Sequence, residues 1–502
     1  MRLAALTLLS VIAAGLATQA TAAQKSLVLL NEADFRDRVF ACWLGKNIGG
    51  TLGMPFEGKR EPQGISFYTN LTPGQPAAND DLDLQILWLK AMQEHDGRVD
   101  ARLLGQYWLA YVPVDWNEYG VGKRNMRRGL LPPVSGEFDN GQWKHSNGAW
   151  IRSEIWACLA PGCPGLAARM AREDACVDHG QAEGTLAEIF TATIESAAFI
   201  ERDRDRLLAI GLAMIPKDCQ VAIAVRAAMD AKRAGKDWKA ARLDVIAASE
   251  KTGWFQAPRN VAYMILGWLY GEGDFGKSIC TAVNCGDDTD CTGATLGSIL
   301  GILHGTKGIP TQWSGPIGLK IKTVAISGFE HPEDLDTLTG QTVAMAKKVL
   351  AANGMPVRLT DGPAELRRAS RLQLSDPKTA RALWRLSPWQ VVWNEPDLRV
   401  VLDYRSEPVI RPNEPRTVRV VLRYLSDRSL SMRVAIQGLP EGWQVKDLPG
   451  QPITGTRRTC TMDLTFVAPQ VGPEGHAMTL MIAGEGKELR IPVALFPNPV
   501  GP

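Results

Sequence analysis

Between residues 31 and 352, hydrophobic positions recur every three or four residues, which is the spacing of amphipathic helices. Examples are LDLQILWLKAMQEH, which starts at Leu82, and TLAEIFTATIESAAFIERD, which starts at Thr185. Long segments rich in Gly and Pro interrupt the pattern, as from Gly53 to Asp80. Such connections often carry function. The pattern predicts an all-α domain with long loops.

After about residue 388 the pattern changes to short strands rich in Val, Leu, Thr and Arg, separated by Pro, Gly and Asn turns. About seven such strands fit an immunoglobulin-like β-sandwich. We therefore expect a multidomain protein. Its parts are an all-α domain over residues 31–352, a polar, proline-interrupted linker over 353–388 and a small all-β sandwich over 389–500.

The first 23 residues carry one Arg, an apolar run from Leu3 to Leu16 and the small residues Ala20, Thr21 and Ala22. This order predicts a cleaved signal peptide over residues 1–23 and a secreted or periplasmic protein. The alternative is a membrane anchor, which needs a run of roughly 20 apolar residues. The observed run is shorter, and no later segment reads as a membrane span.

Charge and cysteine content narrow the possible partners. Lys plus Arg is 56 and Asp plus Glu is 54, so the net charge is only +2, and no basic run suggests nucleic acid. Export permits disulfides among the nine cysteines, with Cys158–Cys163 and Cys280–Cys285 as close-spaced candidates and at least one thiol left over. Six His and no Cys-x-x-Cys pair argue against a structural zinc site.

Two predicted helices begin with clusters of aspartates, and their later residues are almost entirely apolar. The clusters are Asp80, Asp81 and Asp83, and Asp287, Asp288 and Asp290. Helix capping explains one carboxylate for each helix. Adjacent like charges cost stability unless a cation neutralises them, and Mg²⁺ and Ca²⁺ prefer oxygen ligands. We expect one or two divalent ions between the two helix starts, with capping and solvated charge as the alternative.

The helix after the second cluster has one face nearly without side chains. Gly293, Ala294, Gly297, Ser298 and Gly301 fall on that face. Gly costs about 1 kcal/mol relative to Ala inside a helix, so its repetition indicates a packed central helix. The bare face allows the close approach of either a neighbouring backbone or a ligand.

Four segments in order resemble the ADP-ribosylglycohydrolase family. They are GKNIGGTLGMPFEG from Gly45, NDDLDLQ from Asn79, SNGAWIR from Ser146 and NCGDDTDCTGATLGSILG from Asn284. The resemblance covers about residues 34–350 and none of the β-domain. It implies an all-α orthogonal helical fold with a dinuclear Mg²⁺ centre, for which Mn²⁺ is the alternative ion.

The resemblance implies a specific ligand set. The metal ligands carried over are Asn79, Asp80, Asp81, Asp288, Asp290 and Cys291. This sequence departs from the family pattern at three positions. Asn79 stands where the family commonly has a Thr oxygen ligand, Cys291 replaces a second Thr with a soft thiol, and Gly50 replaces an Asp of the opening helix.

The catalytic candidates are Glu57, which aligns with a family glutamate near the scissile bond, and the metal ligand Asp81. As a general base, Glu57 must reach a water or hydroxyl within about 3 Å. The alternative for Glu57 is a solvated loop residue. His179 resembles a family histidine that approaches the ligand, and its alternative is a capping or packing role.

Further substrate contacts are expected from two loops. Backbone N–H groups of Gly148 and Ala149, after Asn147, could cradle a phosphate. The segment NEYGVGKRNMRRG offers Tyr119 for stacking and basic side chains for an anion, unless it is a solvated basic loop. The substrate-binding candidates are Tyr119, Asn147, Gly148, Ala149, His179 and Gly286. The general family pattern does not place residues 132–140, which are a candidate for shaping the substrate pocket.

Together these observations predict a hydrolase. It would cleave a ribosyl-type N- or O-glycosidic bond in a small-molecule or glycan substrate with a ribose-like ring. One alternative is a glycosidase acting on an extracellular glycan or furanoside. The other is an inert ligand-binding protein on the same fold, against which the retained core aspartates argue. The sequence does not indicate an oligomeric state.

Overall fold

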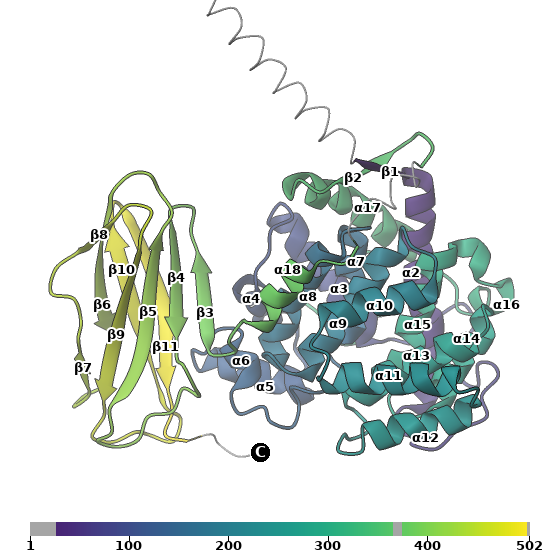
Figure 1. Ribbon diagram of the computed structural model, residues 1–502, viewed down its shortest axis with the longest axis horizontal. Coiled ribbons are helices and arrows are strands. Elements are labelled where there is room, and N and C mark those ends of the chain that lie inside the picture. The colour runs from purple at the N-terminus through teal and green to yellow at the C-terminus, as the bar shows by residue number, and fades with distance from the viewer. Residues whose placement is uncertain (1–26, 365–373, 499–502) are drawn as a thin grey trace, which may run out of the picture.

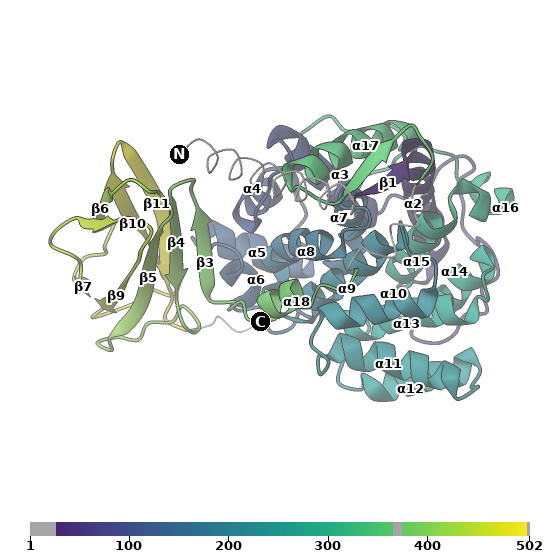
Figure 2. The same ribbon diagram turned by 45° about the horizontal axis from the view of Figure 1, so that its top comes forward.

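The computed structural model describes residues 27–364 and 374–498. The predicted signal peptide, part of the predicted linker and the last residues of the predicted β-domain lie outside these ranges. A helical domain stands beside a β-sandwich (Figures 1 and 2). No helix within the described ranges combines the length and the apolar character that crossing a membrane requires.

Residues 32–352 form the predicted all-α domain, which is confirmed. Its α-helices are α2 (Glu32–Gly53), α3 (Asp80–Glu94), α4 (Ala101–Tyr111), α5 (Asn117–Arg127), α6 (Val134–Glu137), α7 (Glu154–Leu159), α8 (Pro164–His179), α9 (Glu183–Ala198), α10 (Arg204–Met214), α11 (Gln220–Arg233), α12 (Trp238–Ala248), α13 (Ala257–Tyr270), α14 (Phe275–Asn284), α15 (Thr289–His304), α16 (Thr311–Ser314) and α17 (Leu335–Ala352). Short 3₁₀ helices are η1 (Met54–Phe56), η2 (Trp150–Arg152) and η3 (Thr306–Gly308).

Helices α2 and α15 form the centre of this domain, and glycines allow their backbones to touch. A Cβ added at Gly49 would lie 1.9 Å from the carbonyl oxygen of Gly293, and one at Gly45 would lie 2.1 Å from that of Gly297. At Gly53 it would lie 2.2 Å from the carbonyl oxygen of Thr289, the first residue of α15. The face of α15 that is nearly without side chains therefore packs against the backbone of α2. This contact fixes where α15 begins.

The described part of the predicted linker, residues 353–364 and 374–388, contains two regular elements. Strand β2 (Val357–Thr360) pairs in parallel with β1 (Val28–Asn31), so it joins the start of the helical domain. Helix α18 (Pro377–Trp384) starts with Pro, which needs no N–H partner at that position. The indole N–H of Trp384 donates to the carbonyl of Met214 at 2.8 Å, which ties α18 to the helical domain.

The C-terminal region is a sandwich of two antiparallel sheets, as expected. Its strands are β3 (Gln390–Asn394), β4 (Leu398–Asp403), β5 (Arg416–Tyr424), β6 (Leu430–Gln437), β7 (Gln444–Lys446), β8 (Ile453–Gly455), β9 (Thr459–Val467), β10 (His476–Gly484) and β11 (Lys487–Leu495). The sheet orders are β3-β4-β5-β9-β7 and β11-β10-β6-β8. The described residues of this region form nine strands, two more than the seven or so expected from the sequence. Alternating buried positions, such as Val400 and Leu402 on β4, form the core between the sheets.

Residues 132–140 dock the β-sandwich onto the helical domain. Val134 and Phe138, on and just after α6, are fully buried in the same apolar core as the strands. The rings of Phe138 and Phe496 stack with their centres 5.2 Å apart, and the guanidinium of Arg128 lies 4.2 Å from the centre of the Phe496 ring. None of the described residues of this segment lines the candidate pocket described below. The segment therefore does not line that pocket.

All nine cysteines lie in the described part of the chain, and each is a free thiol there. The close-spaced candidates Cys158–Cys163 and Cys280–Cys285 are therefore not disulfides in this structure. Eight of the nine are buried, and Cys460 of the β-sandwich is partly exposed.

Candidate metal centre

The aspartate clusters lie at the starts of α3 and α15, and their carboxylates are not used as caps. The side-chain oxygen of Asn79 caps α3 by accepting the N–H of Asp81 at 2.9 Å. Asp288 occupies the N-cap position of α15, yet its side chain caps no described backbone N–H. The capping explanation therefore does not account for the carboxylates.

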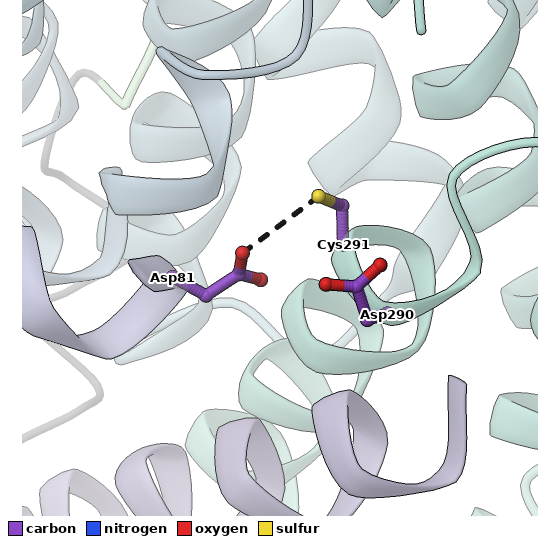
Figure 3. A group of neighbouring side chains, drawn as sticks. All are labelled: Asp81, Asp290 and Cys291. Atoms are coloured by element: carbon purple, nitrogen blue, oxygen red, sulfur yellow. Dashed lines mark hydrogen bonds between the residues drawn. The ribbon is translucent and has the colours of Figure 1, made fainter. Parts of the chain in front are cut away.

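Two groups of potential ligand atoms meet between these helix starts. Asp81, Asp290 and Cys291 each offer one ligand atom, and these atoms lie within 4.8 Å of one another. Glu57, Asp288 and Asp290 form a second group by the same measure. Figure 3 shows Asp81 on one side facing Asp290 and Cys291 on the other. Asp290 belongs to both groups, so the two groups are adjacent.

The remaining aspartates of the clusters have other partners. Asp83 accepts the backbone N–H groups of Val324 and Ala325, each at 2.6 Å. Asp287 pairs with Arg60 and Arg259, each at 3.5 Å. These two carboxylates stabilise loops, so each cluster contributes only part of its charge to the centre.

Neighbouring side chains hold the inward-facing carboxylates in place. The Tyr119 hydroxyl donates to Asp80 at 2.7 Å, and the Asn147 amide donates to Asp288 at 2.7 Å. The Asn79 amide donates to Asp290 at 3.1 Å. The predicted substrate contacts Tyr119 and Asn147 thus also orient predicted metal ligands.

The centre holds more negative charge than nearby cations balance. Lys46 lies 2.7 Å from Glu154 and 3.7 Å from Asp81. Burial, together with Asp290, raises the pKa of Asp288 well above its usual range. Burial also raises the pKa of Asp81 well above its usual range, against the effect of Lys46. Buried carboxylates that stay charged require a cation.

The donor atoms fit a divalent cation. Within the described chain, one oxygen on each of three buried carboxylates lacks a hydrogen-bond partner: Asp81 Oδ2, Asp288 Oδ1 and Asp290 Oδ1. Unsatisfied buried polar atoms are rare in folded proteins and need an explanation such as an ion. Carboxylate oxygens are the ligands that Mg²⁺ and Mn²⁺ prefer.

The loop after η1 places Glu57 at this centre. The Gly58 N–H donates to the Asp287 carbonyl at 2.8 Å, and the Asp287 N–H donates to the Lys59 carbonyl at 2.9 Å. Gly286 supports this contact, because a Cβ there would lie 2.6 Å from the Lys59 carbonyl oxygen. Partial burial of the carboxyl group and the neighbouring Asp290 and Asp80 raise the pKa of Glu57 to about 7.

A pocket of about 390 Å³ opens onto the centre. It is lined by nine predicted site residues: Glu57, Asn79, Asp80, Tyr119, Asn147, Gly148, Asp288, Asp290 and Cys291. Asp81 lies behind this lining, next to Cys291, whose thiol donates to its carboxylate at 3.7 Å. These nine residues, which come from distant segments of the sequence, therefore meet around one cavity.

The structure does not bring Ala149, His179 or Gly286 into the lining of this pocket. His179 is fully buried, with Nδ1 at 2.9 Å from Asp178 and Nε2 at 3.1 Å from the Ser146 hydroxyl. It therefore contacts the segment that carries Asn147. Ala149 is fully buried just before η2.

The basic segment after Tyr119 is helix α5, not a loop, and its cations are engaged elsewhere. Lys123 is fully buried, donates to the carbonyl of Val112 at 2.7 Å and pairs with Asp115 at 2.7 Å. Arg124 pairs with Asp139 at 3.0 Å. None of the described residues that line the pocket is Lys, Arg or His.

Three aromatic residues and one acid in the pocket wall were not predicted. Trp116 and Trp254 are 43% and 37% exposed, and Phe255 stands beside Trp254 at a ring distance of 5.2 Å. Glu118 also lines the pocket, and burial raises its pKa to about 7. The three aromatic residues lie outside the quoted segments, so the sequence carried no local signal for them. Glu118 lies within the quoted segment NEYGVGKRNMRRG, directly before the predicted Tyr119, and was overlooked there.

The raised carboxyl pKa values predict a stability that depends on pH and metal. A carboxyl whose pKa is higher in the folded protein holds its proton longer there than in the unfolded chain. The free energy of unfolding of metal-free protein should therefore fall as pH rises from about 4.3, the pKa of Glu in the unfolded chain, through about 7, the pKa of Glu57 and Glu118 in the folded protein. Thermal unfolding in a chelator should give a lower Tm at about pH 8 than at about pH 5.5.

Added Mg²⁺ or Mn²⁺ should raise the Tm more at the higher pH, because deprotonated carboxylates bind cations. If the Tm of the metal-free protein rises between about pH 5.5 and about pH 8, the buried carboxylates do not carry unbalanced negative charge.

Comparison with known proteins identifies the family of this chain. A search of the curated proteins gives no match. A family model described as ADP-ribosylglycohydrolase matches residues 31–348, which is more than half of the chain and contains both aspartate clusters. The match spans the helical domain and ends before the β-sandwich. The chain therefore belongs to the ADP-ribosylglycohydrolase family.

Proposed function

We propose that this protein is an exported, metal-dependent glycohydrolase that cleaves a ribosyl-type N- or O-glycosidic bond. Family membership supports a hydrolase function of the glycohydrolase type. The observation that carries the proposal is the meeting of the α3 and α15 carboxylates, with unpartnered oxygens, beside one pocket. Export is supported by the N-terminal sequence, with its apolar run and small-residue cleavage pattern.

The residues divide into holding and reacting groups. Asp80, Asp81, Asp288 and Asp290 would hold two Mg²⁺ ions, or Mn²⁺, and Tyr119 and Asn147 orient two of these carboxylates. When bound, such ions supply Lewis-acid stabilisation to the hydroxyls of a ribose-like ring.

Glu57 is the candidate general base. Its carboxyl group faces Asp288 and Asp290, and its pKa of about 7 is near neutrality, where a base is most effective. A group in this position can accept a proton from the water that attacks the anomeric carbon. Gly286 and the Asp287 backbone keep the Glu57 loop at the metal centre.

A second candidate function is hydrolysis of an uncharged glycoside, such as a furanoside or an extracellular glycan. The absence of Lys, Arg and His among the described lining residues favours it, because a diphosphate usually meets such groups. The exposed faces of Trp116 and Trp254 favour it as well, because aromatic rings offer flat apolar surfaces to a sugar.

A substrate panel tests both candidates. Protein reconstituted with Mg²⁺ or Mn²⁺ should hydrolyse at least one class among ADP-ribosyl conjugates, nucleosides, ribofuranosides and neutral oligosaccharides. Preference for ADP-ribosyl conjugates or nucleosides supports the first candidate. Preference for ribofuranosides or neutral oligosaccharides supports the second candidate. Product formation is followed by chromatography.

The matched variant is Glu57→Gln, which keeps the shape of the side chain and removes the base. We expect a decrease in kcat of about 100-fold to 10,000-fold, the usual contribution of general base catalysis, with Mg²⁺ still bound. If the variant has the kcat of the parent, Glu57 is not the general base. A parent protein that binds metal and hydrolyses nothing in the panel would favour the inert ligand-binding alternative.

A further inference from the structure

The two ligand groups of the centre differ in chemistry. Glu57, Asp288 and Asp290 offer only oxygen, whereas Asp81, Asp290 and Cys291 offer two carboxylates and one thiol. Asp290 and Cys291 are consecutive residues on the first turn of α15, and both contribute ligand atoms to this group. Figure 3 shows the Cys291 sulfur directed toward the Asp81 carboxylate from the opposite side of the site.

The thiol group is enclosed and has unsatisfied neighbours. Cys291 is 5% exposed, and Asp81 and Asp290 are 1% and 6% exposed. The Cys291 sulfur lies 3.7 Å from Asp81 Oδ1, while Asp81 Oδ2 and Asp290 Oδ1 have no hydrogen-bond partner within the described chain. Two buried oxygens without partners, next to a sulfur, point to a ligand that accepts electron pairs from all three.

Lys46 does not take the place of that ligand. Its ammonium group lies 3.7 Å from Asp81 Oδ2, which is beyond hydrogen-bond distance. The same group donates at 2.5 Å to the Ile151 carbonyl and at 2.7 Å to Glu154, so its close partners are on η2 and α7. Asp81 Oδ2 therefore has no hydrogen-bond partner within the described chain and remains available to a cation.

We propose that Asp81, Asp290 and Cys291 form a subsite that selects a borderline divalent ion, Zn²⁺, over Mg²⁺, while the carboxylate oxygens of Asp288 and Asp290 take a hard ion and leave Glu57 beside it as the base. This inference rests on the proposed metal-dependent function. Thiolate sulfur is a soft donor that binds Zn²⁺ well and Mg²⁺ poorly, and carboxylates accept both. On binding, a metal–sulfur bond forms and the thiol proton is released to solvent.

Three protein donors also suit a reactive rather than a structural zinc. Structural zinc sites are closed by four protein ligands, whereas catalytic ones have three and leave a position for water or substrate. The Asp81, Asp290 and Cys291 group has three, and Cys291 and Asp290 line the pocket. The centre would thus hold two different ions, a hard ion bound by oxygen donors and, beside it, a borderline ion bound by the subsite.

Metal titration of the full chain tests the selectivity without relying on activity. Metal-free protein is titrated calorimetrically with Zn²⁺ and with Mg²⁺, and Co²⁺ serves as a spectroscopic probe whose absorption reports a thiolate ligand. The variant is Cys291→Ser, which replaces sulfur with oxygen at the same position. The matched control is Cys460→Ser, because Cys460 lies in the β-sandwich, far from α15 in the chain.

We expect Cys291→Ser to weaken Zn²⁺ binding by at least about 10-fold, to lose the thiolate–cobalt absorption and to retain Mg²⁺ binding. The retained Mg²⁺ binding also shows that the variant is folded. Cys460→Ser should behave as the parent does. If the parent binds Mg²⁺ but Zn²⁺ affinity and the cobalt spectrum are the same in Cys291→Ser, the selectivity is wrong and the proposed function stands. If the parent binds no divalent ion, both are overturned.

Discussion

Replacing Asp288 and Asp290 together with alanine should abolish Mg²⁺ binding and lower kcat by at least about 1,000-fold. Asp290 belongs to both groups of ligand atoms, and Asp288 belongs to the all-oxygen group, so the double variant damages both sites. Lewis-acid stabilisation is worth several kcal/mol in the transition state, which is the origin of the expected loss. The measurement is calorimetric titration of metal-free parent and variant, followed by turnover of the best substrate in the panel.

The matched control for this experiment is Asp287→Asn. Asp287 adjoins Asp288 in the chain, but its carboxylate pairs with Arg60 and Arg259, away from the metal groups. Its backbone φ is +61°, a conformation that Asn tolerates well. The control should lose some stability and keep its Mg²⁺ affinity. Parent-like binding by the double variant would show that the ion binds elsewhere.

The carboxylates that meet at the candidate metal centre could be predicted because their signal is local. Two carboxylates at adjacent positions before an apolar helix are costly, and the cost is visible in the sequence alone. The same reasoning could not separate Asp288 from Asp287, or Asp81 from Asp83, because these neighbours differ only in what lies opposite them. Asp83 meets the backbone of Val324 and Ala325, which are far from it in the chain.

The pocket wall could not be predicted for a similar reason. Trp116 and Trp254 approach the pocket from segments far apart in the chain, and each sits in an unremarkable local pattern. The basic residues of α5 gave a misleading signal, because an exposed anion site and a buried Lys123 hydrogen-bonded to carbonyls look alike in sequence. Only the packing of α5 distinguishes them.

Residues 132–140 show how tertiary contacts override local sequence. Their composition, rich in Pro and Gly, resembles a loop that could shape a pocket. Phe138 instead stacks on Phe496, a residue of the β-domain. The domain boundary was visible as a change of periodicity, but the surface that joins the domains was not, because it is built by residues from both sides of that boundary.

The second large effect concerns the contact between α2 and α15. Gly49→Ala should lower the free energy of unfolding by more than about 3 kcal/mol, at the upper end of what overpacking costs. The added Cβ would stand 1.9 Å from the carbonyl oxygen of Gly293, a backbone atom that cannot rotate away. The helices would have to separate, which also displaces the first turn of α15 and with it Asp290 and Cys291. Urea unfolding with and without Mg²⁺ measures both consequences.

The matched control is Gly340→Ala on α17, the same substitution inside another helix. Its added Cβ would meet only the end of the Arg36 side chain, at 3.4 Å, so the variant should be as stable as the parent or more stable by up to about 1 kcal/mol. A Gly49→Ala protein as stable as this control, with parent-like Mg²⁺ affinity, would show that the helices tolerate separation. The position of the metal ligands would then be set by the loops around the centre and not by the glycine contact between α2 and α15.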